Sequence, residues 1–293
     1  MHYPSITILY NPNSTGAGEK NARRFARRLE RAQCADRVEV KATERIGHAL
    51  ELAYAAAKKY PDGLIVASSG DGGYNEVVNG VMRANNEGSG AATGLLASGN
   101  ANDHYKALHK PYVVRRIKKG DLRKIDVLKL TATVNGKPWE HYAHSYIGFG
   151  VTSEIGKALN EAELNRANEV VIFLKTLVKS KPFVIKISGK KHELNSIIVS
   201  NVGRMSKIFS LSKQAKVDDG LCEVVSVEQG MTKLVGTMVK SATVGLPHEK
   251  QVKSYTIRTT DPLPVQLDGE VFTLDADCTA TVSVVPKALG CII

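Results

Sequence analysis

The stretch SSGDGGYNEVVNG, residues 68–80, directly follows the apolar run LIVA, residues 64–67. A short apolar run that stops at turn residues is typical of a buried β-strand. The two turns and the aspartate between them therefore predict a loop at the end of that strand. In open α/β sheets, ligands bind outside the carboxyl ends of the strands. This loop is thus the first candidate for a binding site.

Strand and helix patterns alternate on both sides of this loop, within the first 126 residues. Strands alternating with helices predict a parallel sheet covered by helices on both faces. The predicted strands are ITILYN (6–11), RVEVKAT (37–43), LIVASSG (64–70) and GLLASG (94–99). The predicted helices are EKNARRFARRLERA (19–32) and GHALELAYAAAKKY (47–60).

From about residue 126 the pattern changes to runs rich in β-branched residues, such as DVLKLTATV, NSIIVSN and TATVSVV. Turn signals such as NG, SG and DG separate several of these runs, which predicts an antiparallel sandwich or barrel. One helix is expected between Glu161 and Ser180. The sequence thus predicts two domains, 1–126 and 127–293, and leaves open that the last residues return to the first domain.

Composition favours a cytoplasmic protein. The 293 residues contain 43% hydrophobic and 24% charged residues. No run approaches the roughly 18 apolar residues of a membrane span, and the N-terminus lacks the pattern of a secretory signal. The four cysteines have no metal-ligand spacing, so free thiols are expected.

Forty Lys and Arg against 29 acidic residues give a net charge of +11, which favours anionic partners. Nucleic acid is not expected, because the 6% of aromatic residues do not interleave with the basic runs. Contact with an anionic membrane surface at the inner membrane face is expected instead. A homodimer is left open.

Three loops of the first domain combine small residues with Asn or Asp: YNPNSTGAG (10–18), SSGDGGYNE (68–76) and ASGNAND (97–103). Glycine permits close approach of the backbone, so that successive N–H groups can converge on an anion. Phosphate is the natural ligand of such loops. Neither a GxxxxGK[ST] nor a GxGxxG motif is present to explain them.

SGDGGYNEVVNG (69–80) resembles the GGDGTxNEVxNG signature of the diacylglycerol kinase catalytic domain family, which includes bacterial lipid kinases, sphingosine kinases and ceramide kinase. Four other segments resemble that family's elements in the same order over nearly the whole chain. They are NPNSTGAG (11–18), GLLASGNANDHYKAL (94–108), KVDDGLCEVV (216–225) and VQLDGE (265–270).

The resemblance implies a lipid kinase with an NAD kinase/diacylglycerol kinase-like α/β domain that binds ATP. A mainly antiparallel β-sandwich domain would supply lipid contacts and the catalytic base. Diacylglycerol is the expected acceptor. A sphingoid base, another lipid alcohol and a non-catalytic lipid- or nucleotide-binding homologue are alternatives. A soluble NAD kinase is a further alternative, but the DDGL and LDGE segments favour a lipid kinase.

The resemblance also implies roles for individual residues. Glu270 matches the general base, and Asp71 would organise Mg²⁺ and water in an acidic network with Asp103 and Asp126. A second, structural Mg²⁺ would be bound by the Asp219 carboxylate and by main-chain oxygens of Lys216 and Leu221, because oxygen ligands suit this ion. The residues expected around ATP are Asn11, Pro12, Asn13, Ser14, Thr15, Thr43, Gly70, Asp71, Gly72, Gly73, Tyr74, Asn75, Glu76 and Asn100.

Several positions depart from the family pattern: Ser69 replaces a glycine, Gly73 and Asn100 replace threonines, and Thr152 replaces an acidic residue. Loss of one threonine hydroxyl removes a hydrogen bond with a net value of about 0.5–1.5 kcal/mol. The chemistry is therefore expected to be retained, whereas these departures leave the substrate open.

Three further expectations concern local structure. Gly72 is expected to hold its loop with a positive φ angle. His104 and Tyr105 are expected in the first turn of a packed helix. His141 and His144, which lack neighbouring ligands in the sequence, are expected at the surface rather than around a metal.

Overall fold

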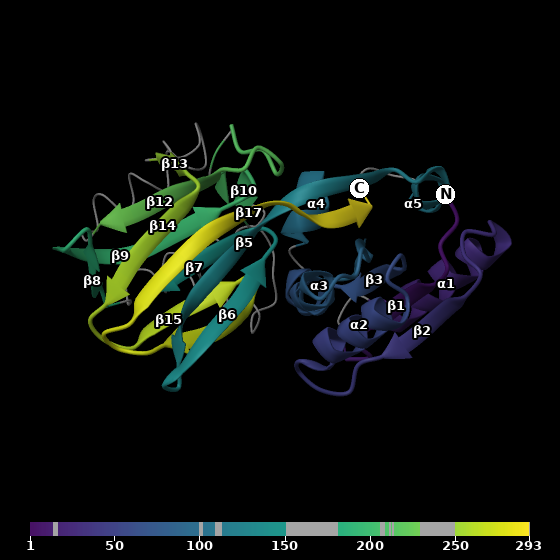
Figure 1. Cartoon of the computed structure of the whole chain (residues 1–293), viewed down its shortest axis with the longest axis horizontal. Helices are drawn as coiled ribbons and strands as arrows, with labels where there is room; N and C mark the ends of the chain where they lie inside the picture. The colour runs from purple at the N-terminus through teal and green to yellow at the C-terminus, as the bar shows by residue number, and fades with distance from the viewer. Residues whose placement is uncertain are drawn as a thin grey trace. The chain divides into compact units, whose positions relative to one another are not determined.

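The computed structural model describes residues 1–13, 17–99, 102–108, 113–150, 181–205, 209–210, 212, 214–228 and 250–292 (Figure 1). The chain forms two compact units. Unit 1 consists of Met1–Asp126 together with Pro286–Ile293, and unit 2 consists of Val127–Val285. The chain crosses from one unit to the other within two long strands, β5 (Leu122–Val134) and β17 (Thr279–Ile292).

Unit 1 contains a parallel sheet with the strand order β17, β4, β3, β1, β2. Ile6 of β1 pairs with Leu64 of β3 on one side and with Val38 of β2 on the other. β1 and β3 are buried along their whole length, as expected for central strands of a parallel sheet. The elements are β1 (Ile6–Tyr10), α1 (Gly18–Arg31), β2 (Val38–Ala42), α2 (His48–Lys59), β3 (Leu64–Ser69), α3 (Asp71–Asn86), β4 (Ala92–Ala97), α4 (Asp103–Leu108) and α5 (Val113–Lys119).

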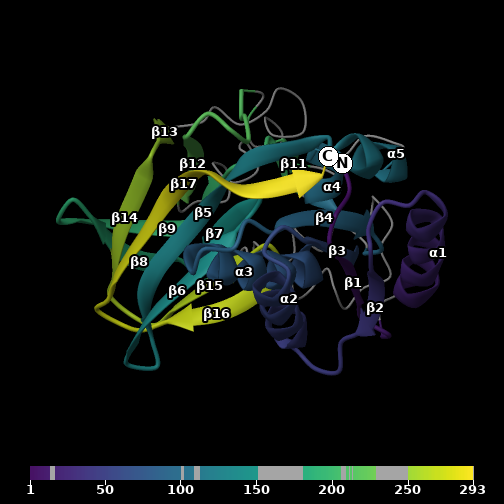
Figure 2. The same ribbon diagram turned by 45° about the vertical axis from the view of Figure 1, so that its right-hand side comes forward.

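Helices cover both faces of this sheet, with α1 on one side and α2 and α3 on the other (Figure 2). Phe25 and Leu29 of α1 pack in one apolar core with Ile6 and Ile8 of β1. The side chain of Leu9, which points to the opposite face, lines a cavity together with residues of α2 and α3. The alternation of strand side chains thus supplies apolar contacts to both helical layers.

Gly80 allows α2 and α3 to pack closely. A Cβ atom at this position would lie 2.3 Å from the carbonyl oxygen of Leu50 and 2.8 Å from Ala53 Cβ, both in α2. The glycine that ends the NEVVNG segment is therefore required by the contact between the two helices, which holds the start of α3 in position.

Unit 2 is an antiparallel β structure. β9 pairs antiparallel with β7, β8 and β12, and β15 pairs antiparallel with β7 and β16. The remaining elements are β6 (Lys137–Ala143), β7 (Tyr146–Gly150), β8 (Phe183–Ile187), β9 (Lys190–Ser200), β10 (Arg204–Met205), β11 (Phe209–Ser210), β12 (Cys222–Glu228), β13 (Lys250–Val252), β14 (Ser254–Thr259), β15 (Leu263–Leu267) and β16 (Glu270–Leu274).

The predicted fold class is confirmed: a parallel α/β region is followed by a mainly antiparallel β region. The apolar core of unit 2 is formed by alternate residues of its strands, among them Ile147, Phe149, Ile197 and Val199. The helix expected between Glu161 and Ser180 and the departure at Thr152 lie outside the described residues.

Candidate active site

The three loops expected to bind phosphate are joined at their bases by side-chain hydrogen bonds. Ser68 Oγ donates to the carbonyl oxygen of Gly18 at 2.9 Å, and the hydroxyls of Ser68 and Ser98 lie 3.3 Å apart. Asn21 Nδ2 donates to Ser98 Oγ at 3.1 Å. These contacts fix the start of α1 relative to the ends of β3 and β4.

Two glycines bring the loops after β3 and β4 into backbone contact. A Cβ atom on Gly99 would lie 2.4 Å from Gly70 Cα, so neither position has room for a side chain facing the other. Asn102 holds the second loop, because its Oδ1 accepts from Gly99 N–H at 3.1 Å and its Nδ2 donates to Gly99 O at 2.5 Å. At Gly70 and Gly99 the two loops therefore meet through their backbones, and such glycine-rich backbone can approach an anion closely.

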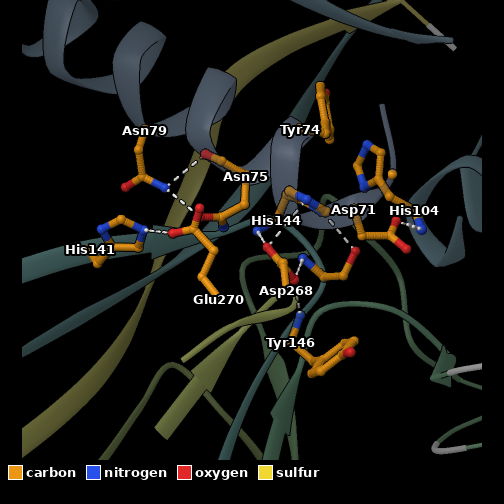
Figure 3. Close-up of polar contacts among 12 residues, drawn as sticks. Asp71, Tyr74, Asn75, Asn79, His104, His141, His144, Tyr146, Asp268 and Glu270 are labelled. Carbon is orange, nitrogen blue, oxygen red and sulfur yellow. Dashed lines mark hydrogen bonds and ion pairs between the residues drawn. The ribbon is translucent and has the colours of Figure 1, made fainter. Parts of the chain in front are cut away.

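Asp71 is the first residue of α3, directly after the N-cap residue Gly70. Its Oδ1 accepts a hydrogen bond from the backbone N–H of His104 at 3.2 Å (Figure 3). A carboxylate at a helix N-terminus also interacts favourably with the helix dipole. Asp71 thus links the glycine loop to the segment that begins α4.

The expectation of a positive φ angle at Gly72 is wrong. Gly72 lies in the first turn of α3, which is helical from Asp71, and it is not among the residues with positive φ. The sharp change of direction is made at Gly70, whose backbone is extended with a φ of −86°. The sequence pattern did not distinguish a glycine loop from a helix with two glycines in its first turn.

A cavity of about 230 Å³ lies on the α2 and α3 side of the sheet of unit 1. Five of its lining residues are among the expected ATP contacts: Asn11, Asn13, Thr43, Gly73 and Glu76. Tyr10 and Ser69, which also line it, lie in the loops expected to bind phosphate, whereas the sequence did not single out the other lining residues, which are Leu9, Glu44, Arg45, Ile46, Ala49, Ala67 and Val77.

Glu76 supports one wall of this cavity. Its two carboxylate oxygens accept hydrogen bonds from the backbone N–H groups of Gly47 and Ala49, at 2.9 and 3.0 Å. These donors lie at the start of α2, where N–H groups have no partner within the helix. The glutamate of the NEVVNG segment therefore caps α2 and holds the loop that carries Arg45.

The other expected ATP contacts differ in position. Ser14, Thr15 and Asn100 lie outside the described residues, as does the side chain of Asp103. Asn75 is buried and its Oδ1 accepts from Asn79 Nδ2 at 3.0 Å, within α3. Pro12, Gly70, Asp71, Gly72 and Tyr74 are not among the described residues that line the cavity.

Tyr74 is fully buried beneath the loop. Its hydroxyl lies 2.8 Å from Thr93 Oγ1 and 3.3 Å from Cys291 Sγ, while its ring lies 4.9 Å from that of His104 between centroids. Burial raises the pKa of the Cys291 thiol to about 11. His104 is also fully buried, in α4, so the expectation of a packed first turn is confirmed for this residue. The buried contacts of Tyr74 thus anchor the start of α3, which follows the SGDGG loop.

Glu270, the expected catalytic base, is the first residue of β16 in unit 2. Its Oε2 lies 3.5 Å from Nε2 of His141 in β6, and Figure 3 shows the two side chains directed toward each other. The Glu270 side chain retains 20% exposure and that of His141 11%. The carboxylate is thus held by a neighbour and still reaches the surface of the unit.

Asp268 anchors the turn that carries Glu270. Its carboxylate is completely buried and accepts backbone N–H bonds from His144, Ser145 and Tyr146, at 2.6, 3.0 and 2.9 Å. The imidazole Nε2 of His144 lies 3.3 Å from the same carboxylate. A buried charge with several donors of this kind is well compensated. The DGE turn is therefore fixed to the segment between β6 and β7.

The expectation that His141 and His144 are surface residues is wrong. His144 is fully buried and His141 is 9% exposed, because each packs beside a carboxylate of the LDGE segment. The two histidines of HYAH and the two carboxylates of LDGE are a signal in the sequence. They indicate a contact only when β6 and the turn before β16 are known to be neighbours.

The residues expected to bind metal come from α3, α4 and β5 and from the turn before β12. Asp126 is buried and its Oδ1 accepts from the backbone N–H of Lys287 at 2.7 Å. Asp219 Oδ1 accepts from Leu221 N–H at 3.0 Å, within an exposed turn that also contains Lys216. Among the described residues, no group of three or more His, Cys, Asp and Glu side chains is arranged to hold a metal ion.

Comparison with known proteins finds matches for both parts of the chain. Residues 5–130 match the diacylglycerol kinase catalytic domain, and residues 145–293 match the YegS C-terminal NAD kinase beta sandwich-like domain. A diacylglycerol kinase of Staphylococcus aureus is 25% identical over 282 residues, covering 90% of this chain and 85% of that protein. One from Staphylococcus saprophyticus is 24% identical over 246 residues, covering 78% and 77%.

The crystal structure of a diacylglycerol kinase from Bacillus anthracis has the same fold, with a TM-score of 0.71 at 19% identity, and covers 100% of this chain and 97% of that one. The chain therefore belongs to the diacylglycerol kinase catalytic domain family. It is a lipid kinase, and its phosphoryl donor is ATP. In the described part of the chain, no helix has the length and apolar character needed to span a bilayer.

Proposed function

We propose that this lipid kinase transfers the γ-phosphate of ATP to the hydroxyl group of diacylglycerol. The observation that carries the proposal is the cavity beside the SGDGG loop, in a chain whose two parts match the two domains of this family. The choice of diacylglycerol is supported by the relatives of that name. A sphingoid base or another lipid alcohol is the alternative acceptor.

Unit 1 binds ATP in this proposal. Asn11, Asn13 and Thr43 supply polar groups to the cavity, and Arg45 supplies a positive charge. The backbone N–H groups at the start of α3 face the phosphates, since helix N-termini favour anions. Phosphoryl transfer depends mainly on such positioning and charge neutralisation.

Asp71 is the residue of unit 1 best suited to hold Mg²⁺ near the phosphates. Its carboxylate is partly exposed beside the glycine loop, and oxygen is the ligand atom that Mg²⁺ prefers. When bound, Mg²⁺ would neutralise negative charge on the phosphates. Asp103 and Asp126 complete the proposed acidic network, and the hydrogen bond from His104 N–H keeps Asp71 in place.

Glu270 acts as the general base in unit 2. A carboxylate that remains partly exposed can approach the acceptor hydroxyl and take its proton as the oxygen attacks phosphorus. The buried Asp268 fixes the backbone two residues before it. Glu270 therefore has the rigid support that a catalytic base requires.

The turn around Asp219 is proposed to hold a second, structural Mg²⁺. The donor set fits this ion, because the Asp219 carboxylate and the main-chain oxygens of Lys216 and Leu221 are all oxygen ligands. Asp219 is exposed, so its carboxylate has no burial penalty to overcome before it binds a cation. A tightened turn in the presence of Mg²⁺ would be detected as reduced proteolysis near these residues.

Helix α1 is proposed to contact an anionic membrane surface. Six cationic side chains of this helix are exposed, whereas only two acidic side chains accompany them. A lysine or arginine close to an anionic bilayer contributes about 1 kcal/mol to binding. Vesicles containing phosphatidylglycerol should therefore sediment with the protein, and less so after charge removal at Lys20, Arg23, Arg24, Arg27, Arg28 and Arg31.

The proposed reaction is tested by incubating the purified protein with labelled ATP, Mg²⁺ and a panel containing diacylglycerol, sphingosine and ceramide in mixed micelles. Labelled phosphatidic acid is the expected product, and the Glu270→Gln variant is the control. A labelled sphingoid base in its place would correct the acceptor. If no lipid is labelled above the level of Glu270→Gln, the proposed function is overturned.

A further inference from the structure

Within unit 2, the imidazole of His141 faces the carboxylate of Glu270. Nε2 of His141 lies 3.5 Å from Oε2 of Glu270, and both side chains are largely shielded from solvent. His141 lies in β6 and Glu270 begins β16, so residues 129 positions apart in the sequence form this pair (141 from 270). In Figure 3 the ring is directed toward the carboxylate.

Two aromatic side chains fix the plane of the imidazole. The ring of Trp139 is stacked on that of His141, with 5.4 Å between centroids and 3° between planes. Phe272 lies on another side, 5.0 Å from His141 at 53°, and also contacts Trp139 at 4.8 Å. With its ring held by packing, His141 can present Nε2 in a single direction.

The same strand is tied to the same turn at a second point. His144 lies three residues after His141 in the HYAH segment, and Asp268 lies two residues before Glu270. Asp268 accepts from three successive backbone N–H groups, beginning with that of His144. The backbone after His141 and the backbone before Glu270 are therefore held together, which limits the freedom of the pair to change its geometry.

We propose that His141 is a positioning residue that holds the Glu270 carboxylate in the rotamer used for catalysis. This inference rests on the proposed role of Glu270 as general base. A glutamate has three rotatable side-chain bonds, and its ordering is entropically costly unless a partner selects one rotamer. Because a base must lie within hydrogen-bond distance of the proton it removes, loss of the partner lowers the rate of the chemical step.

Two substitutions separate the polar contact with Glu270 from packing. His141→Phe keeps an aromatic ring between Trp139 and Phe272 but removes the ring nitrogens. His141→Gln retains an N–H donor and loses the ring. We expect kcat to fall about 10- to 100-fold in His141→Phe, the scale associated with misplacement of a catalytic group. The KM for ATP and the melting temperature should stay near the parental values, and His141→Gln should recover part of kcat.

Glu270→Gln and the double variant His141→Phe/Glu270→Gln complete the experiment. If His141 acts through Glu270, the double variant is no slower than Glu270→Gln alone. If His141→Phe keeps the parental kcat while the separate variant Glu270→Gln is inactive, the inference is overturned and the proposed function stands. A parental kcat in Glu270→Gln overturns the role of the base itself.

Discussion

The side chain of Ser69 occupies the space that a side chain at position 73 would need. A Cβ atom on Gly73 would lie 2.8 Å from Ser69 Cβ and 3.0 Å from Ser69 Oγ. The family signature has glycine at the first position and threonine at the second, and both residues of this chain line the cavity. The two departures are therefore complementary. The family signature has a hydroxyl at position 73, in the first turn of α3, whereas this chain has one at position 69, at the end of β3.

This relationship predicts that Gly73→Thr is tolerated only when Ser69 is replaced by glycine. In the parental background the new side chain meets Ser69, and such overpacking typically costs about 1–3 kcal/mol. We expect a lower melting temperature and weaker ATP binding for Gly73→Thr, and recovery of both in Ser69→Gly/Gly73→Thr. Thermal unfolding with and without ATP·Mg²⁺ measures both effects.

Ser69→Gly alone serves as the control for the lost hydroxyl. Removal of one neutral hydrogen bond is expected to raise the KM for ATP by up to about tenfold, since its net value is about 0.5–1.5 kcal/mol. If Gly73→Thr lowers the melting temperature equally in the parent and in Ser69→Gly, the side chains at positions 69 and 73 do not compete for this space.

Asp71→Asn should preserve the fold and impair catalysis. The two side chains are nearly isosteric, and the amide oxygen can still accept from His104 N–H. The charge that balances Mg²⁺ is lost, so we expect kcat to fall about 10²-fold or more, as for one preorganised electrostatic contact. Asp62→Asn, at an exposed position of the same unit, is the matched control. A parental rate in Asp71→Asn would rule out the proposed metal role.

Gly80→Ala should destabilise unit 1. The added methyl group would lie 2.3 Å from the Leu50 carbonyl oxygen, which is backbone and cannot rotate away. Overpacking costs about 1–3 kcal/mol and exceeds the gain in helix propensity of about 1 kcal/mol. Gly90→Ala, where the nearest atom would be 3.6 Å away, is the comparison. Indistinguishable melting temperatures would mean that α2 and α3 separate without cost.

The buried thiol of Cys291 predicts a dependence of stability on alkaline pH. An unfolded cysteine has a pKa of about 8.5, whereas burial raises the pKa of Cys291 to about 11. The folded state therefore keeps a proton that the unfolded state loses, and this contribution to stability is complete below about pH 8.5 and falls as the pH rises toward 11. The stability difference between the parent and Cys291→Ala should narrow over this interval. A constant difference would contradict the prediction.

Much of the fold follows from local pattern. The helices predicted at 19–32 and 47–60 correspond to Gly18–Arg31 and His48–Lys59, because apolar residues such as Phe25 and Leu29 recur with the helical period. Glycine at 70 and 99 likewise indicated the binding loops. The pairing of Cys291 with Thr93 could not be found this way, since the apolar pattern of a strand does not identify the strand that lies beside it.

The candidate site was predictable where the motif is continuous in the sequence. Asn11, Thr43 and Glu76 were found from the resemblance, and all three line the cavity. His141 was not, because its contact with Glu270 depends on which strands of unit 2 lie side by side. Charged and polar side chains read singly are usually exposed, and that general tendency gave the wrong result for both histidines.

The C-terminal end of β17 belongs to unit 1, where it lies beside β4 and where Lys287 N–H binds Asp126. During synthesis the residues up to Asp126 leave the ribosome long before residues 286–292, so the nascent N-terminal portion lacks this strand until residues 286–292 have been translated. Domains that are continuous in the chain fold in order from the N-terminus. Here the described strands of unit 2 are complete first, and the parallel sheet of unit 1 is completed afterwards.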